Sequence, residues 1–299
     1  MHKSGFVTIV GKPNVGKSTF LNHMLKQKIA ITSSKPQTTR HAIRGIYNDI
    51  DSQIIFIDTP GIHHPKHALG QVMREQALNT LNAVDLIILM VSAVEKTDDL
   101  DLEIINQLTH TKTPVLLVVN KIDLAKDMKR LKEKIEHYKT LFPFKAVLAI
   151  SALEGQYTDK LIVDIKSFLE EGPKYYPEDQ VTDHPEKFLI SELIREKVLM
   201  YTQEEVPHSV MVLIEYMEAD ETLDHVLNIH ASIIVERDSQ KGIIIGKGGH
   251  MIKRIGTAAR KDILALLGVK IFLDLHCKVV KDWRNKALYL KNFGFKDEL

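Results

Sequence analysis

The chain begins with residues whose types and spacing suit an anion. A short apolar run, residues 6–10, leads into a glycine-rich loop and then a segment with helical periodicity. Glycines in such a loop let backbone N–H groups approach an anion closely, because a side chain would block that approach. Lys17 adds a positive charge, and Ser18 adds a hydroxyl that Mg²⁺ accepts as a ligand. The order strand, loop, helix predicts a phosphate site at Gly11, Lys12, Pro13, Asn14, Val15, Gly16, Lys17, Ser18 and Thr19.

A second loop follows the apolar strand at residues 54–57 and supplies a carboxylate and a glycine. The Asp58 carboxylate is able to hold Mg²⁺ through its water shell, and the backbone N–H of Gly61 is able to reach a γ phosphate. The loop therefore predicts a γ-phosphate sensor that consists of Asp58, Thr59, Pro60 and Gly61.

A polar segment at residues 35–40 lies between the first helix and this sensor. A threonine hydroxyl there would complete the Mg²⁺ shell when the γ phosphate is present. We expect Thr39 to do so, and Thr38 is the alternative. The predicted metal ligands are Ser18, Thr39 and Asp58.

A third loop predicts which base the site accepts. Asn120 and Lys121 follow a buried strand, residues 115–119, and are expected to tie the loop to the phosphate loop and to cover the base. The Asp123 carboxylate accepts from both N1–H and the exocyclic amine of guanine, an arrangement that adenine lacks. Ser151 and Ala152, after the next strand, are expected to offer a backbone N–H to the guanine oxygen. The loops together predict a site for GTP and GDP.

Strand-like and helix-like segments alternate through the first half of the chain. This alternation predicts an α/β domain with a mainly parallel sheet flanked by helices, and such sheets bind ligands at the carboxyl ends of their strands. We place this domain at residues 1–172, a linker at 173–183 and a second domain at 184–299. The predicted segments after residue 50 are 53–57, 69–81, 85–91, 100–108, 114–119, 128–142, 145–150 and 159–171.

Composition excludes several classes of protein. The 299 residues are 44% hydrophobic and 26% charged, which is ordinary for a globular protein. A single cysteine, Cys277, excludes an internal disulfide and is expected to be a buried strand residue in a reducing compartment. The apolar stretches are too short to cross a bilayer, and no targeting segment is visible. We therefore expect a cytoplasmic protein.

The net charge of +1 hides an asymmetry in the second half. Residues 181–236 carry 3 basic and 12 acidic side chains, whereas residues 237–299 carry 14 basic and 6 acidic ones. A Gly246-Lys247-Gly248-Gly249 loop lies in the basic part and has the GxxG pattern that clamps a nucleotide backbone. The predicted RNA-binding residues are Ile244, Ile245, Gly246, Lys247, Gly248, Gly249 and Lys253.

A basic helix, residues 250–267, follows this loop. Its apolar residues are expected to pack against a sheet, and contact with an anionic membrane is an additional possibility. Helix, strands and this loop predict an α+β KH-type fold.

The five loops in this order resemble those of the Era family, bacterial members of the translation-factor-related GTPases, and the C-terminal KH-type (type II) domain extends the resemblance to essentially the whole chain. The resemblance implies binding to the single-stranded 3′ end of small-subunit ribosomal RNA and a role in small ribosomal subunit assembly. Independently of the resemblance, we expect a monomer, and the basic helix adds peripheral contact with the cytoplasmic face of the cell membrane as a further possibility.

Hydrolysis would depend on few protein groups. The expected catalytic residues are Lys17, Thr39, Gly61 and Asn14. Ile62 stands where related enzymes carry a water-orienting glutamine, so unassisted turnover should be slow. In related GTPases an asparagine at the position of Asn14 binds K⁺, which makes K⁺ stimulation an expectation alongside the Mg²⁺ requirement. The alternative to a GTP-driven switch is an RNA clamp in which the nucleotide is structural.

Overall fold

The computed structural model describes residues 2–295 except residues 36, 205, 221, 222 and 224. The chain forms two compact units. The first comprises residues 1–30, 39–66 and 70–183, and the second comprises residues 31–38, 67–69 and 184–299. Among the described helices, none is long and apolar enough to cross a membrane.

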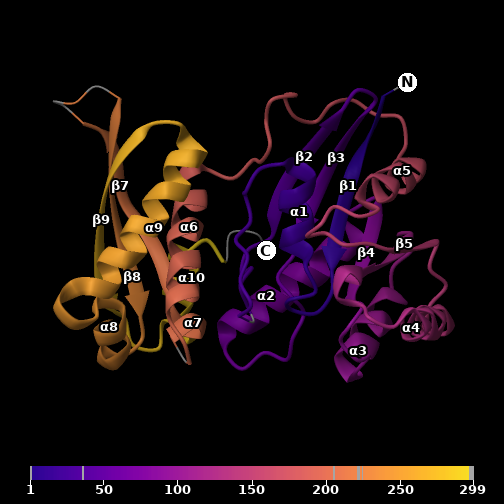
Figure 1. Cartoon of the computed structure of the whole chain (residues 1–299), viewed down its shortest axis with the longest axis horizontal. Coiled ribbons are helices and arrows are strands. Elements are labelled where there is room, and N and C mark those ends of the chain that lie inside the picture. Colours follow the sequence, from indigo (N-terminus) through magenta and orange to yellow (C-terminus); the bar gives the residue numbers. More distant parts are fainter. Residues whose placement is uncertain (1, 36, 205, 221–222, 224, 296–299) are drawn as a thin grey trace. The chain divides into compact units, whose positions relative to one another are not determined.

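The first unit is built on a six-stranded sheet with the order β2-β3-β1-β4-β5-β6 (Figure 1). Every neighbouring pair is parallel except β2 and β3, which are antiparallel. Strand β2 was not predicted from the sequence; it is an edge strand whose Arg44, Asn48 and Asp49 are polar. The strands are β1 (Lys3–Val10), β2 (Ile43–Asp49), β3 (Ser52–Asp58), β4 (Leu86–Ser92), β5 (Val115–Asn120) and β6 (Ala146–Ala149).

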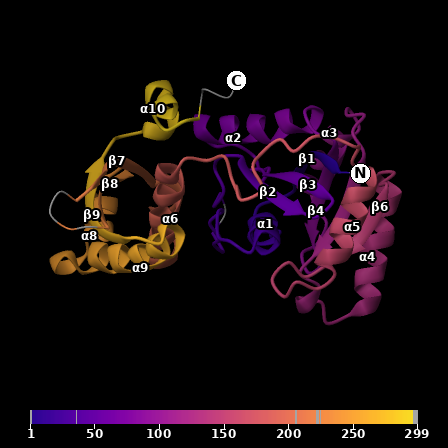
Figure 2. The ribbon, with the colours of Figure 1, turned by 90° about the horizontal axis from the view of Figure 1, so that it is seen from above.

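Helices cover both faces of this sheet. One face packs against α2, α3 and α4 in a single apolar cluster with β1, β4 and β5. Figure 2 shows α1 on the opposite side of the sheet from α2. The helices are α1 (Lys17–Leu25), α2 (Ala68–Asn79), α3 (Asp99–Leu108), α4 (Met128–Leu141) and α5 (Thr158–Phe168). The loops predicted to carry chemistry follow β1, β3, β5 and β6, so the parallel sheet collects them at one edge.

The second unit is a three-stranded sheet, β7-β8-β9, covered by helices (Figure 1). β8 is antiparallel to β7 and parallel to β9. Ile255 and Ile263 of α9 are fully buried in its core, as the expected packing against a sheet requires. The elements are α6 (Glu186–Tyr201), α7 (Val206–Ser209), β7 (Met211–Ala219), β8 (Val226–Val235), α8 (Asp238–Ile245), α9 (His250–Leu267), β9 (Lys270–Val279) and α10 (Ala287–Asn292).

Candidate nucleotide site and nucleic-acid groove

The glycine-rich loop connects β1 to α1, and its two glycines, Gly11 and Gly16, leave backbone there uncovered by side chains. Gly16 caps α1 in the left-handed region, with φ 105°. A Cβ atom at Gly16 would lie 2.1 Å from the side-chain nitrogen of Asn120. Asn14 is also left-handed, with φ 63°, a conformation that asparagine tolerates better than most residues. The α1 amino terminus therefore presents its N–H groups toward the loop, where an anion is favoured.

Lys17 is buried and directed at the loop itself. Its Nζ donates to the carbonyl of Gly11 at 3.2 Å and to that of Lys12 at 2.9 Å. Burial lowers the pKa of Lys17 to about 8, and the charge of Asp58 opposes that shift. An anion bound in the loop would raise this pKa again, because a nearby negative charge favours the protonated form.

Lys12 contributes to the loop through its backbone. Its side chain is directed at the start of α3, with Nζ 2.9 Å from Asp98 and 2.7 Å from Asp101. Asp98 is itself the amino-terminal cap of α3. The phosphate loop is thus anchored to a neighbouring helix, and Lys12 does not add a second free charge.

Three oxygen donors meet beside the loop. Ser18 Oγ lies 2.8 Å from Thr39 Oγ1 and donates to Asp58 Oδ2 at 2.6 Å. Asp58 is fully buried, and its Oδ1 has no hydrogen-bond partner among the described residues. Burial raises the pKa of Asp58 to about 6, and its interactions with Lys17, Ser18 and Thr39 oppose the rise. A buried carboxylate with an oxygen left over, beside two hydroxyls, is a donor set that suits a hard divalent cation.

Thr39 and not Thr38 belongs to this donor set. Thr38 Oγ1 donates to the carbonyl of Lys35 at 2.6 Å and stays within its own segment. Pro36, in the same segment, lies outside the described residues. The geometry therefore favours Thr39 over Thr38 as the metal ligand.

The sensor loop packs directly on the phosphate loop. A Cβ atom at Gly61 would lie 2.7 Å from both the backbone nitrogen and the Cα of Pro13. Thr59 donates its hydroxyl to the carbonyl of Ile9 at 2.8 Å, so its side chain fixes the loop to β1. Ile62 is 2% exposed and its N–H donates to the Gly11 carbonyl at 3.1 Å. Its side chain lies in the core and cannot orient a water.

Asn120 joins the phosphate loop to the two base loops. Its side-chain amide donates to the Val15 carbonyl at 2.8 Å, and its oxygen accepts from the Ala152 N–H at 2.9 Å. The residue is 2% exposed. This is the tie to the phosphate loop that the sequence analysis expected of Asn120.

The remaining predicted guanine-binding residues differ in whether their polar groups are open to a base or already paired within the protein. Asp123 is exposed, so its carboxylate is open to a base. Lys121 is left-handed, with φ 68°, and its Nζ lies 3.5 Å from Glu95. The expected N–H from Ser151 or Ala152 is already used within the protein, because Ser151 N–H donates to the Gln156 carbonyl at 3.1 Å and Ala152 N–H to Asn120. A base oxygen would have to take one of these N–H groups from its present acceptor.

The GxxG loop of the second unit connects α8 to α9. Gly246 has φ 72°, and a Cβ atom there would lie 2.7 Å from the Cβ of Met251. Gly248 and Gly249 are also left-handed, and a Cβ atom at either would meet nothing within 4 Å. The loop thus exposes backbone over a stretch where another backbone is able to approach closely.

A groove lies between α9 and β9, and its lining begins at Ile252, three residues after this loop. It encloses about 230 Å³ and is lined by Ile252, Lys253, Gly256, Thr257, Arg260, Leu273 and Leu275. Leucine side chains form an apolar wall and two basic side chains provide charge, which is the combination that holds unstacked bases and their phosphates.

One predicted RNA contact is wrong. Ile244 is fully buried in the core of the second unit, whereas its neighbour Ile243 is 47% exposed. The reason is that these isoleucines end a helix, α8, which turns only one of its faces inward. Lys253, by contrast, lines the groove as expected.

Comparisons with known proteins agree with both units. Residues 6–121 match the model of the 50S ribosome-binding GTPases, and residues 205–284 match the KH domain model. A variant of Era from Aquifex aeolicus, solved with GDP and AlF₄⁻, is 42% identical with a TM-score of 0.95, and the match covers 98% of this chain and 99% of that one. Era solved with MgGDPNP and nucleotides 1506–1542 of 16S ribosomal RNA is 41% identical with a TM-score of 0.96, covering 99% of each chain.

The chain belongs to the Era family of GTPases. Membership confirms the predicted fold class, a P-loop GTPase domain followed by a KH domain. It also confirms the resemblance drawn from the loops and identifies the chain as a GTP-hydrolysing enzyme.

Sequence reasoning missed two groups that the structure brings together. Glu196 of α6 accepts from the Thr32 N–H, and Arg195 of α6 donates to the Thr38 carbonyl. No short motif marks such a pair, although two charged residues within an apolar helix were a usable signal, since charges are rarely fully buried unless they are paired. The second group, His230, Asp274 and His276, comes from two strands that are distant in sequence.

Proposed function

We propose that this chain is a GTP-driven switch that binds small-subunit ribosomal RNA near its 3′ end and assists assembly of the small ribosomal subunit. The observation that carries the proposal is one chain with both a guanine-nucleotide site and a basic KH groove, shared at 41% identity with Era solved with MgGDPNP and 16S ribosomal RNA.

Mg²⁺ is the cofactor that fits the donor set beside the phosphate loop. Ser18, Thr39 and Asp58 would hold it, directly or through water, and it would neutralise charge on the β and γ phosphates when bound. Lys17 would add its own charge on the phosphate side, and the N–H of Gly61 would donate to the γ phosphate. Because Ile62 is buried, the attacking water must be positioned by other groups, which is consistent with slow turnover in the absence of an activator.

The switch segment offers a route from nucleotide to RNA. Residues 31–38 belong to the second unit, and residue 39 carries the hydroxyl at the metal site. Within the second unit, the Thr32 N–H donates to Glu196 at 3.0 Å, and the buried Arg195 donates to the Thr38 carbonyl. Arg195 is fixed by Glu192, with Nε to Oε1 at 2.7 Å.

Ion pairs of Lys197 connect α6 to α9. Lys197 lies 2.8 Å from Glu196 and 2.6 Å from Asp262 of α9, the helix that lines the groove. The ordering of Thr39 around Mg²⁺ and the γ phosphate would thus bias the position of residues 31–38, and through α6 that of α9.

Filter-binding titrations of a single-stranded oligonucleotide matching the ribosomal 3′ end test the switch. We expect affinity to differ between the states bound to a non-hydrolysable GTP analogue and to GDP. The Lys197→Met variant should reduce that difference, while Lys187→Met, at an exposed position on the same helix, should preserve it. Equal affinity in both nucleotide states, with function retained after Lys17→Ala, would instead support an RNA clamp with a structural nucleotide.

We further propose that K⁺ stimulates hydrolysis through Asn14. The residue is exposed in the phosphate loop and has a left-handed conformation, with φ 63°, and K⁺ would bind through its amide oxygen. Single-turnover hydrolysis should be faster in KCl than in NaCl, and Asn14→Ala should remove the difference. Equal rates of the unaltered protein in the two salts would refute this part of the proposal.

A further inference from the structure

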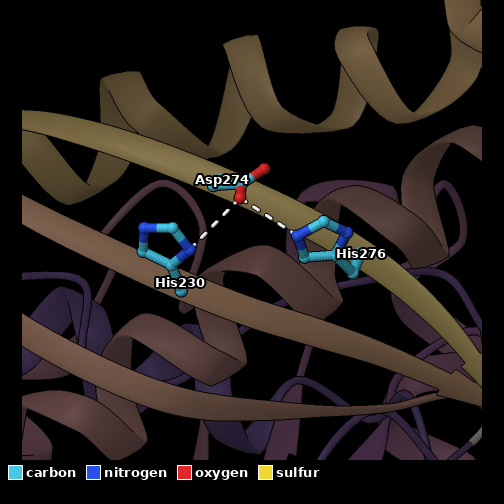
Figure 3. A group of neighbouring side chains, drawn as sticks. All are labelled: His230, Asp274 and His276. Carbon is cyan, nitrogen blue, oxygen red and sulfur yellow. Dashed lines mark hydrogen bonds and ion pairs between the residues drawn. The ribbon is translucent and has the colours of Figure 1, made fainter.

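Two histidines and one aspartate lie together on the sheet of the second unit. His230 of β8 and Asp274 of β9 are paired across the parallel ladder. His276 lies two residues after Asp274 and therefore shares its face of the strand, because side chains alternate between faces. Figure 3 shows the two rings directed at the same carboxylate from either side.

The ligand atoms are close enough to share one ion. Asp274 Oδ2 lies 3.1 Å from His230 Nδ1 and 3.0 Å from His276 Nε2. One ligand atom from each of the three residues lies within 4.8 Å of the others. Two ligands bound to Zn²⁺ at about 2.0–2.1 Å in tetrahedral geometry are about 3.3 Å apart, so small side-chain adjustments suffice.

We propose that His230, Asp274 and His276 form a binding site for Zn²⁺ or a similar transition-metal ion. Two imidazole nitrogens and one carboxylate oxygen favour such ions over Mg²⁺ and Ca²⁺, which prefer oxygen ligands. Three protein ligands leave a fourth position for water or an external donor. This site is separate from the nucleotide site and does not depend on the proposed function.

Exposure of the three side chains suits an open site. The His230 side chain is 23% exposed, Asp274 is 35% exposed and His276 is 60% exposed. Two ligands are therefore partly enclosed, and the third faces solvent, so an ion is able to enter without a change in the fold.

The surroundings hold the ligands in place. Tyr216 of β7 stacks on the His230 ring, with centroids 4.0 Å apart and planes inclined by 21°. Asp274 and His276 lie two residues apart on β9, and the pairing of β9 with β8 holds them beside His230. A site whose ligands are ordered before binding loses less conformational entropy when the ion arrives.

Neighbouring groups are unsuitable as a fourth ligand. Glu215 already accepts from Ser232 at 2.7 Å and pairs with Lys278. Cys277 lies on the opposite, core-facing side of β9, and burial raises the pKa of its thiol to about 11. The proposed site thus consists of the three named residues and solvent.

Metal binding would change which ring nitrogens carry protons. Without an ion, an ionised Asp274 is only able to accept, so the 3.1 Å and 3.0 Å contacts of its Oδ2 would favour a proton on Nδ1 of His230 and on Nε2 of His276. Binding a metal through these nitrogens requires that the protons lie on the opposite nitrogen of each ring. Nitrogen-15 NMR of the histidine rings distinguishes the two tautomers.

The test uses the full, untagged chain saturated with GDP and excess Mg²⁺, so that the nucleotide site does not titrate. Calorimetric titration with Zn²⁺ should show one site per chain, and Zn²⁺ should switch the tautomers of His230 and His276. Asp274→Asn and His276→Gln should each weaken binding by roughly tenfold or more. His64→Gln is the control, since His64 lies 3.7 Å from a single carboxylate, that of Glu103.

Three results would overturn the proposal. They are the absence of Zn²⁺ binding with unchanged tautomers, unchanged affinity in both Asp274→Asn and His276→Gln, and loss of the site in His64→Gln. His276→Gln changes a mostly exposed side chain, so the variant is expected to fold, and its circular dichroism spectrum checks this.

Discussion

Replacing Asn120 by alanine should destabilise the first unit strongly. The side chain donates to the Val15 carbonyl at 2.8 Å and accepts from the Ala152 N–H at 2.9 Å, at a position that is 2% exposed. Alanine would leave two buried backbone groups without partners. Each such group costs about 1–3 kcal/mol, so the free energy of unfolding should fall by about 2–6 kcal/mol. Domains are stable by only about 5–15 kcal/mol, which makes this a large share.

Urea unfolding of the nucleotide-free protein measures the loss. Far-ultraviolet circular dichroism reports on both units, whereas the only tryptophan, Trp283, is fully buried in the second unit and reports on it alone. We expect the circular dichroism transition of Asn120→Ala to begin at lower urea while the tryptophan fluorescence transition keeps its midpoint.

The matched control is Asn106→Ala, an exposed asparagine on α3. It should change stability by less than about 0.5 kcal/mol, as surface substitutions usually do. A loss below about 1 kcal/mol for Asn120→Ala would contradict the reasoning, because the two backbone groups would then have found other partners.

Three further predictions follow from single contacts. Burial raises the pKa of Asp58 from 3.8 to about 6. Between these two pH values the folded protein without nucleotide or metal keeps a proton on Asp58 that the unfolded chain has released. The free energy of unfolding therefore falls as pH rises from about 4 to about 6. Asparagine does not titrate, so Asp58→Asn should not lose stability in this way. In urea titrations, the unfolding free energy of the variant minus that of the unaltered protein should grow by at most about 3 kcal/mol from about pH 4 to about pH 7. Ile62→Gln should not accelerate single-turnover hydrolysis, because the amide would be buried in the core and not beside the nucleotide. The buried amide should lower the free energy of unfolding in urea by about 1–3 kcal/mol. Faster turnover in this variant would contradict the prediction. Gly246→Ala should weaken oligonucleotide binding in filter assays, since φ is 72° and its Cβ would lie 2.7 Å from that of Met251, whereas Gly242→Ala, where a Cβ meets nothing within 4 Å, should not.

The sequence predicted those parts of the fold whose local signals agree with their tertiary environment. Strands β1, β3, β4 and β5 are apolar runs buried on both sides of a sheet, and β1, β3 and β5 are each followed by a loop with its own chemistry. Helix α2, predicted at residues 69–81, spans Ala68–Asn79. Strand β2 was missed because it lies at the sheet edge, where solvent permits polar residues and the apolar signal weakens.

The sequence predicts which residues form the nucleotide site but not which hydrogen bonds and ion pairs they make with the rest of the protein. The motifs identify Lys17 and Asp58, because phosphate and metal binding need those residue types at that spacing. Spacing does not show that the N–H groups of Ser151 and Ala152 are already paired, or that Lys12 is directed at α3. Those features depend on side-chain rotamers and on contacts between distant segments, which the local sequence does not determine.

The assignment of a guanine-nucleotide site is tested by measuring which base the site prefers. Competition calorimetry with GDP and ADP should show guanine preferred by roughly 10⁴-fold, because a site that demands a hydrogen bond rejects an analogue lacking it. The exposed Asp123 carboxylate supplies that demand, so Asp123→Asn should remove most of the preference. Equal binding of GDP and ADP by the unaltered protein, or an unchanged preference in Asp123→Asn, would show that Asp123 does not select guanine.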